Sequence, residues 1–222
     1  LAWTFGLLPI TYPASLDRTQ PVAMVRLPAD GAIKVGWGGD NVRTNYHAAT
    51  PDQRWAYDLL MAPYLSGSDQ LGDYGCYGRP VLAPADGVVS AAIDGLPDEV
   101  PGITSNNIAN PAGNHVAIRL DETGTYLLIA HLKPGSVTVS ASERVSEGQP
   151  IGECGNSGNT SEPHIHLHHQ RQDPAEAPIG FAEGLPLYFR DHDGPPMPVG
   201  GLTIQDGTPV ATGVTVQHLG AE

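Results

Sequence analysis

The stretch Pro163-His164-Ile165-His166-Leu167-His168-His169 determines how the rest of the chain is interpreted. Three of its four histidines alternate with apolar residues, which is the period of a half-buried β-strand. His164, His166 and His168 would therefore share one face. Same-face neighbours lie about 6 to 7 Å apart, from a rise of about 3.3 Å per residue, so two imidazoles can reach one cleft. A neutral imidazole is a common zinc ligand and the commonest acid or base near neutral pH. The alternative is a histidine-rich strand without chemistry.

The composition favours β structure. Glycine and proline are abundant among the 222 residues, at 27 and 21, and charged residues make up only 16%. Short apolar runs recur between turn-forming residues, and no long segment has the spacing of an amphipathic helix, so a mainly β fold is predicted. The predicted strands lie within residues 31–39, 54–60, 80–84, 87–91, 113–120, 125–132, 163–169, 185–189 and 210–218.

Three regions are expected along the chain. Residues 1–30 contain four prolines and are predicted to form an irregular strap. Residues 31–190 would form the functional domain, and residues 191–222 a C-terminal extension packed on or near it. Two long loops, residues 63–79 and 94–113, are expected to form the walls of a binding groove, because long loops in compact domains usually shape a site.

The charge of the chain restricts its partners. With 11 basic and 24 acidic residues, the formal net charge is −13. Nucleic-acid binding needs clustered Lys and Arg, so this balance argues against nucleic acid, and it disfavours docking on an anionic membrane. No apolar run approaches the roughly 20 residues of a membrane-spanning helix.

Export can be inferred only indirectly. The chain begins with Leu1 rather than Met and shows no signal-peptide pattern, so we expect a processed form. Cys76 and Cys154 are the two cysteines, and each stands beside a glycine in a turn-like setting. In an oxidising compartment they would form one disulfide, and the alternative is two free thiols.

Five residues from four separate strands or strand edges are candidates for one catalytic site: His47, Asp58, His131, His164 and His166. A catalytic zinc site needs three protein ligands with N or O donors and an open position for water, which two histidines and a carboxylate supply. The metal lowers the pKa of its water to about 7 and polarises a carbonyl. The remaining imidazoles would act as acid, base or donors to the developing oxyanion. Spacing alone leaves open which of His164 and His166 binds metal.

Each candidate also has a structural explanation. Asp58 would otherwise make a salt bridge or a turn cap, His47 would be an exposed loop residue, and His131 a satisfied residue at the end of an apolar strand. His168 would either orient a catalytic partner or be a solvated strand residue. Other catalytic classes lack support, because the chain has no Gly-x-Ser-x-Gly elbow, no phosphate-binding glycine loop and no His-Glu-x-x-His helix motif.

Five motifs, in order over roughly residues 31–170, resemble the lysostaphin/LytM-type zinc metallopeptidases. They are Asn45-Tyr46-His47 with Ala56-Tyr57-Asp58, residues 81–89, residues 113–118, Ala130-His131-Leu132, and residues 145–152 followed by Pro163-His164-Ile165-His166. The resemblance implies an antiparallel β fold in which long loops form a groove. It also implies one zinc ion per chain, held by His47, Asp58 and His166, with His131 and His164 as the catalytic histidines that do not bind metal.

The sequence departs from many family members at two places. Residues 48–57 separate His47 from Asp58, a longer interval that resembles a longer-spaced subgroup. His168 stands where the family often has an aromatic or acidic residue.

The activity implied by the resemblance is that of a zinc-dependent endopeptidase. It would hydrolyse peptide bonds in the stem or cross-bridge of bacterial peptidoglycan by metal-activated water, in a secreted or cell-envelope protein. Two alternatives remain: a non-catalytic wall-binding or regulatory module of the same fold, and a zinc peptidase that acts on a non-wall peptide. The oligomeric state is left open.

Overall fold

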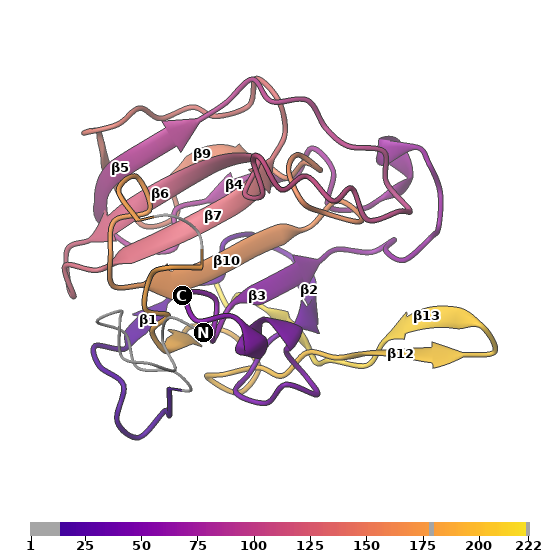
Figure 1. The fold of residues 1–222 in the computed structure, drawn as a ribbon, viewed down its shortest axis with the longest axis horizontal. Coiled ribbons are helices and arrows are strands. Elements are labelled where there is room, and N and C mark those ends of the chain that lie inside the picture. The colour runs from indigo at the N-terminus through magenta and orange to yellow at the C-terminus, as the bar shows by residue number, and fades with distance from the viewer. Residues whose placement is uncertain (1–13, 178–179, 221–222) are drawn as a thin grey trace.

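The computed structural model describes residues 14–177 and 180–220, and its centre is one eight-stranded sheet (Figure 1). Every neighbouring pair of strands in this sheet is antiparallel, which confirms the predicted architecture. The strands in spatial order are β14 (Thr215–Gln217), β2 (Ala32–Trp37), β3 (Tyr57–Leu60), β10 (Ile165–Gln170), β7 (Tyr126–Leu132), β6 (Asn114–Leu120), β5 (Gly87–Ile93) and β8 (Arg144–Val145).

Three two-stranded sheets complete the β structure. They are the parallel pair β1 (Ala23–Val25) and β11 (Leu187–Phe189), the antiparallel pair β4 (Pro80–Leu82) and β9 (Pro150–Glu153), and the antiparallel hairpin β12 (Leu202–Gln205) and β13 (Thr208–Ala211). The hairpin projects from the body of the molecule (Figure 1). Two short 3-10 helices are described, η1 (Tyr46–Ala49) and η2 (Leu71–Asp73). Among the described residues, no helix is long and apolar enough to cross a membrane.

Alternation along the strands separates an apolar face of the main sheet from a polar one. On β10, Ile165 and Leu167 join the main core, together with Leu59 of β3 and Ile129 of β7. The small sheets β1–β11 and β4–β9 contribute to the same core and so cover this face. His166 and His168 alternate with these core residues along β10, and they lie on the opposite face of the sheet.

One strand prediction needs correction, and one turn joins two different sheets. The predicted strand at residues 210–218 is interrupted, because Gly213 lies between β13 and β14, with its backbone so close to β2 that a Cβ would stand 2.0 Å from the Val35 oxygen. The strands on either side of the turn at residues 85–87 do not pair with each other. Instead β4 pairs with β9, and β5 pairs with β6 and β8, so this turn carries the chain from one sheet to another.

The terminal regions take part in the sheets. Residues 1–13 of the predicted strap lie outside the described residues, and residues 14–30 contain β1, a regular element where none was expected. Parallel pairing with β11 gives β1 main-chain partners and buries Ala23 and Val25. In the C-terminal region, β14 adds a strand to the main sheet beside β2 and buries Val216. The domain limits at 31 and 190 stay a prediction.

Candidate metal and catalytic site

Asp58 and His166 face each other across two neighbouring strands. They are direct partners in the antiparallel register of β3 and β10, and both side chains lie on the polar face. His166 Nδ1 stands 2.9 Å from Asp58 Oδ1, and both residues are buried. The pairing of β3 with β10 therefore builds the centre of the site.

His47 reaches the same carboxylate from the loop before β3. Its Nε2 lies 3.0 Å from Asp58 Oδ2, although eleven positions separate the two residues in the chain. Asn45 caps the 3-10 helix η1 by accepting the main-chain NH of His47, and it donates to the oxygens of Gly39 and Ala56. These three bonds fix the His47 turn against the start of β3, so the long interval does not prevent His47 from reaching Asp58.

A β-bulge turns His131 into the site. Regular alternation along β7 would point His131 toward the core, because Ile129 two positions earlier lies there. Instead, Ala130 and His131 together oppose the single residue His115 of β6, and His131 adopts a left-handed backbone with φ of 62°. Bulges of this kind re-aim side chains and are common beside active sites.

The loop after β9 holds both the backbone and the ring of His131. The main-chain oxygen of His131 accepts a hydrogen bond from the NH of Gly155 at 3.0 Å. The main-chain NH of His131 donates to the Ala112 oxygen, also at 3.0 Å. Its Nδ1 lies 2.8 Å from the main-chain oxygen of Ser157. Only glycine fits at position 155, because a Cβ there would lie 2.3 Å from the main-chain nitrogen of Lys133.

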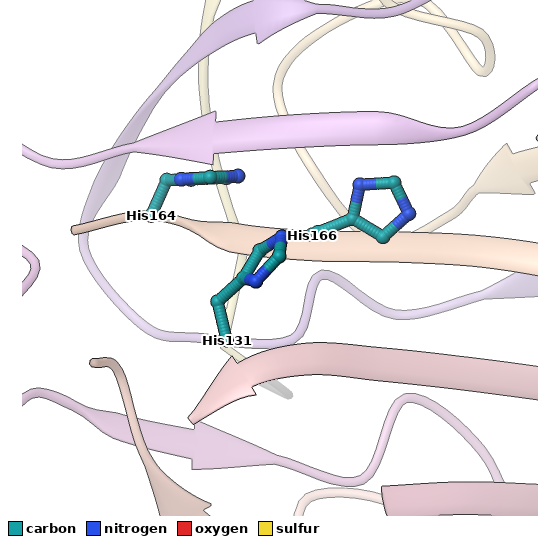
Figure 2. Close-up of side chains that lie close together, drawn as sticks. All are labelled: His131, His164 and His166. Atoms are coloured by element: carbon teal, nitrogen blue, oxygen red, sulfur yellow. The ribbon is translucent and has the colours of Figure 1, made fainter. Parts of the chain in front are cut away.

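His164 stands directly before β10 and meets His131 over the polar face (Figure 2). The centroids of the two rings are 4.8 Å apart. His164 Nδ1 lies 2.7 Å from the main-chain oxygen of Glu162, and its Nε2 lies 3.5 Å from Asp58 Oδ1. A carbonyl oxygen only accepts, so Nδ1 of both His131 and His164 carries the proton, and Nε2 of each neutral ring is the acceptor.

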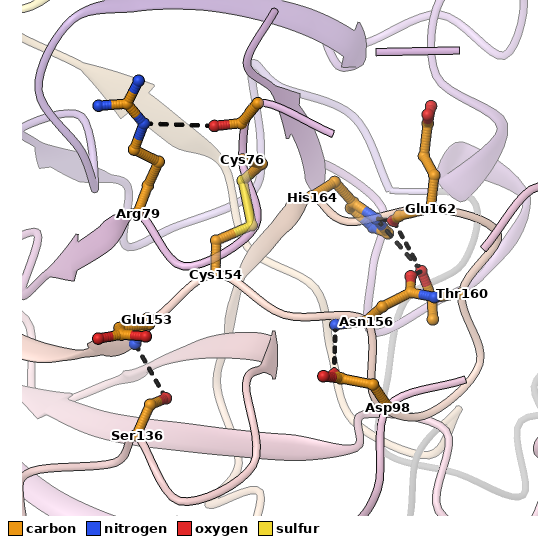
Figure 3. Close-up of a disulfide and its surroundings, with 11 residues drawn as sticks. Cys76, Arg79, Asp98, Ser136, Glu153, Cys154, Asn156, Thr160, Glu162 and His164 are labelled. Atoms are coloured by element: carbon orange, nitrogen blue, oxygen red, sulfur yellow. Dashed lines mark hydrogen bonds between the residues drawn. A yellow bond between two sulfur atoms is a disulfide. The ribbon is translucent and has the colours of Figure 1, made fainter. Parts of the chain in front are cut away.

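A disulfide joins Cys76 to Cys154 just before the loop that holds the two catalytic candidates (Figure 3). The pairing expected for an oxidising compartment is therefore confirmed. Further along the same loop, the main-chain NH of Asn156 donates to Asp98, and the Thr160 hydroxyl donates to Asn156 Oδ1 (Figure 3). The loop is thus fixed at its start and along its length.

These side chains line a groove with a volume of about 610 Å³, a size typical of ligand sites. The lining residues outside the five candidates are Trp37, Tyr46, Thr50, Gln53, Thr104, Pro111, Ala112, Leu128, Ala130, Asn159, Thr160, Ser161 and His168. The loop at residues 94–113 contributes to the wall as predicted. The prediction that residues 63–79 form the other wall is wrong, because they contribute no lining residue. This loop instead contacts the loop before β10, where the Leu65 NH donates to the Glu162 carboxylate and Cys76 is bonded to Cys154.

Burial and neighbouring charges shift the pKa values of the site residues in different directions. Burial alone would raise the pKa of Asp58, but the charges of His47 and His164 and the hydrogen bonds of His164 and His166 hold it well below its usual range. Burial, reinforced by the charges of His164 and His166, holds the pKa of His131 well below its usual value. Burial also lowers the pKa of His166 to about 3. Burial opposes the charge on His164, but Asp58 outweighs it and raises that pKa.

Two overlapping groups of donor atoms could hold a metal ion. One is His47, Asp58 and His166, and the other is His131, His164 and His166; in each group the donor atoms lie within 4.8 Å of one another. The first group contains the carboxylate, and its facing atoms are 2.9 and 3.0 Å apart. Ligands on one tetrahedral zinc stand about 3.3 Å apart at Zn–N distances of about 2.0 to 2.1 Å, so the two contacts to Asp58 are close to the spacing of zinc ligands. The structure thus brings all five predicted residues together.

Sequence reasoning gave no role to Tyr46, although it belongs to the Asn45-Tyr46-His47 motif. Its ring packs on that of His47 with centroids 4.0 Å apart, and the edge of Trp37 meets it. Desolvation of the phenol and the charge of Asp58 raise its pKa, although Tyr46 as a whole is 50% exposed. Tyr46 therefore remains a neutral hydrogen-bond donor at the groove. The motif position gave the only signal for it.

Comparison with known proteins supports a peptidase assignment. Residues 73–178 match the model of Peptidase family M23. This range contains His131, His164 and His166, whereas His47 and Asp58 lie before it and are assigned from their geometry. No curated protein sequence matches the chain.

Several solved structures resemble part of the chain. A zinc-containing peptidase from Vibrio cholerae is 20% identical, with 66% of this chain and 36% of that chain covered and a TM-score of 0.43. Lysostaphin from Staphylococcus simulans is 18% identical, with 68% and 46% covered and a TM-score of 0.41. The isolated catalytic domain of lysostaphin is 18% identical, with 68% and 86% covered and a TM-score of 0.40. The chain thus spans less than half of the length of the first two proteins. The family assignment rests on the family model, not on these structures.

Proposed function

We propose that this chain, of which residues 73–178 match Peptidase family M23, is a zinc-dependent endopeptidase acting on bacterial peptidoglycan. Peptide bonds in the stem or cross-bridge are the proposed substrate. The observation that carries the proposal is the convergence of His47, Asp58 and His166 on one point of the groove. When bound there, zinc would polarise the carbonyl of the scissile amide and lower the pKa of a water molecule to about 7.

His131 and His164 would handle protons and the developing charge. Main-chain carbonyls hold the proton of each ring on Nδ1, so each Nε2 can take a proton from water or, once protonated, donate to an oxyanion or a leaving amine. The Nε2 of His164 faces Asp58 at 3.5 Å, which favours its protonated form. The tight contacts of Gly155 and Ser157 fix the His131 ring before substrate arrives. Such preorganisation lowers the barrier, since little motion is needed during reaction.

The disulfide and the lining of the groove support the location and substrate class of the proposed enzyme. A Cys76–Cys154 disulfide persists in oxidising compartments, which supports a secreted or cell-envelope protein. Beyond Asp58 and the histidines, the described lining residues carry no formal charge. This lining suits a neutral peptide better than a nucleic acid.

Digestion of purified peptidoglycan tests the proposal. The released ends are identified by mass spectrometry, with and without a chelator, for the wild type and for His166→Ala. New amine and carboxyl ends that require metal and His166 are expected. Wall binding without new ends would indicate a non-catalytic module, and metal-dependent cleavage of other peptides but not of wall would indicate a different substrate. Either result would contradict the proposed function.

A further inference from the structure

A row of buried, hydrogen-bonded polar side chains extends along β10 from His166. His166 Nε2 lies 3.0 Å from His168 Nδ1, and His168 Nε2 lies 2.9 Å from Gln170 Oε1. Gln170 Nε2 donates in turn to the main-chain oxygen of Gln172 at 2.7 Å. His166, His168 and Gln170 are 5%, 2% and 3% exposed, so water does not compete freely for these bonds. We refer to these three side chains as the β10 relay.

One backbone atom sets the direction of every bond in the β10 relay. The main-chain oxygen of Gln172 can only accept, so the amide nitrogen of Gln170 must face it and the amide oxygen must face His168. That oxygen also only accepts, so Nε2 of His168 carries a proton. A neutral imidazole has one proton, and Nδ1 of His168 is therefore an acceptor. His166 must then donate from Nε2.

We propose that His168 and Gln170 are positioning residues that fix the tautomer of His166, keeping its proton on Nε2 and its Nδ1 free to bind metal. This inference rests on the proposed role of His166 as a metal ligand. Partners of this kind, bonded to the second ring nitrogen of a ligand histidine, raise metal affinity by fixing ring orientation and tautomer.

The β10 relay opposes the preference that Asp58 alone would impose. A carboxylate 2.9 Å from Nδ1 favours a proton on Nδ1 of a neutral His166. A proton on Nδ1 of His166 would require every bond of the relay to change direction. The lone pairs of His168 Nε2 and Gln170 Oε1 would then face each other, or the Gln170 amide would flip and its oxygen would face the Gln172 oxygen. A buried unsatisfied group of this kind costs about 1–3 kcal/mol. With the relay intact, two acceptors meet between His166 and Asp58, and a cation is the partner that satisfies both.

Three variants separate this role from a general packing role. His168→Leu keeps the side-chain size but removes the acceptor, whereas in His168→Asn the amide oxygen takes the place of Nδ1. Zinc affinity, measured by competition with a chromophoric chelator, is expected to fall roughly 10- to 100-fold in His168→Leu and to stay within about threefold of wild type in His168→Asn. The matched control is His169→Gln, since His169 is equally buried on β10 but bonds to Thr125 and the Pro186 oxygen. It should keep wild-type zinc affinity even where its thermal stability falls.

The tautomer itself is read by long-range proton–nitrogen NMR on protein with ¹⁵N-labelled histidine. The spectra are recorded with and without zinc, at a pH above the ordinary imidazole pKa of about 6.5. The expected result is a proton on His166 Nε2 in both forms, with a coupling through the hydrogen bond to Nδ1 of His168. A metal-free His166 that is protonated on Nδ1 alone would overturn the inference.

The experiment distinguishes failure of this inference from failure of the proposed function. If the wild type binds no zinc, the proposed function fails, and the tautomer of the metal-free protein still decides the direction of the relay. If the wild type binds zinc and His168→Leu binds it equally well, the positioning role is overturned while the proposed function stands. Equal loss of affinity in His168→Asn and His168→Leu would also overturn it.

Discussion

The side-chain amide of Asn45 donates to the main-chain oxygen of Ala56, 3.1 Å away, and so closes the loop between His47 and Asp58. Asn45 is fully buried and also bonds to Gly39 and to the NH of His47. The position of His47 therefore depends on a residue that touches neither the groove nor the proposed metal ion.

Replacing Asn45 with alanine should weaken zinc binding without removing any ligand. The variant leaves buried main-chain groups without partners, at about 1–3 kcal/mol for each unsatisfied group, and frees the His47 turn. Zinc competition titrations and thermal unfolding measure the two effects. Asn41→Ala is the control, because Asn41 is exposed and its side chain accepts only from Arg43 in a surface turn. Unchanged zinc affinity in Asn45→Ala would show that the His47 turn keeps its position without the bonds of Asn45.

His131→Ala should retain zinc and lose turnover. His131 belongs to the proposed catalytic pair, and a positioned acid or base contributes about 10²- to 10⁴-fold in rate. His166→Ala, by contrast, should lose both metal and activity, because one of three protein ligands is missing. Metal content by atomic absorption, measured alongside peptidoglycan hydrolysis, separates the two variants. Loss of metal from His131→Ala would mean that ligand and catalyst have been confused.

Gly113→Ala should impair catalysis from outside the groove. Gly113 has φ of +59°, and a Cβ there would lie 2.4 Å from the main-chain carbon and oxygen of Ser157, whose oxygen holds the His131 ring. The added methyl group must shift Ser157, and displacing a positioned group by about 1 Å can cost about 100-fold in rate. Gly135→Ala is the matched control, since Gly135 also has positive φ but nothing lies within 4 Å of its Cβ position. A comparable loss of kcat in both variants would mean that backbone strain alone is responsible.

Removing the disulfide should lower both stability and turnover. Cys76 and Cys154 are 78 positions apart, for which the loop-entropy model gives about 4.5 kcal/mol of stabilisation. The bond also holds the loop that carries Gly155 and Ser157. The double variant Cys76→Ser/Cys154→Ser should unfold at lower temperature and hydrolyse peptidoglycan more slowly. A phosphine reductant should lower the Tm of the wild type and leave that of the double variant unchanged; equal responses would argue against the bond.

His169 should make the fold sensitive to acid. Burial is the main reason that its pKa falls to about 4 in the folded protein, and the hydrogen bond to the Pro186 oxygen only partly offsets it. Above the unfolded value of about 6.5 both states hold the neutral ring, so stability does not change with pH. Below it the unfolded chain binds a proton that the folded chain excludes, and stability falls by about 3 kcal/mol down to about pH 4.

His169→Gln removes this titration. The variant should be less stable than wild type at neutral pH, and the gap should narrow as the pH falls from about 6.5 to about 4. Urea unfolding at a series of pH values, with chelator in every sample, measures the gap. A gap that stays constant over this window would show that His169 takes up its proton equally in both states.

Alternation predicted the central part of this site from sequence. The period of two on residues 163–169 correctly separated Ile165 and Leu167 from the histidines between them. Applied to the predicted strand at residues 54–60, the same rule puts Asp58 on the face opposite Tyr57 and Leu59, which lie in the core. Alternation could not reveal that Asp58 and His166 are cross-strand partners, because strand register depends on pairing between segments far apart in the chain.

Departures from regular strand geometry could not be predicted from the sequence. His131 enters the groove through a bulge, and alternation alone assigns it to the core. His168 was expected either to orient a partner or to be solvated. It is only 2% exposed, which excludes the solvated alternative. The Gln170 partner depends on a chain of side-chain contacts that no spacing rule describes. The pairing of β4 with β9 likewise arises where the chain passes between sheets rather than folding back on itself.

The projecting β12–β13 hairpin gives the protein a part that is separate from the proposed catalytic groove. Its two ends are tied by a hydrogen bond from the Thr212 NH to the Gly201 oxygen, and β14 resumes the main sheet beyond them. The tip at Asp206 and Gly207 is exposed, and no residue of the hairpin lines the groove. A fluorescent label or an affinity tag inserted at this tip would thus extend the molecule while leaving substrate access untouched.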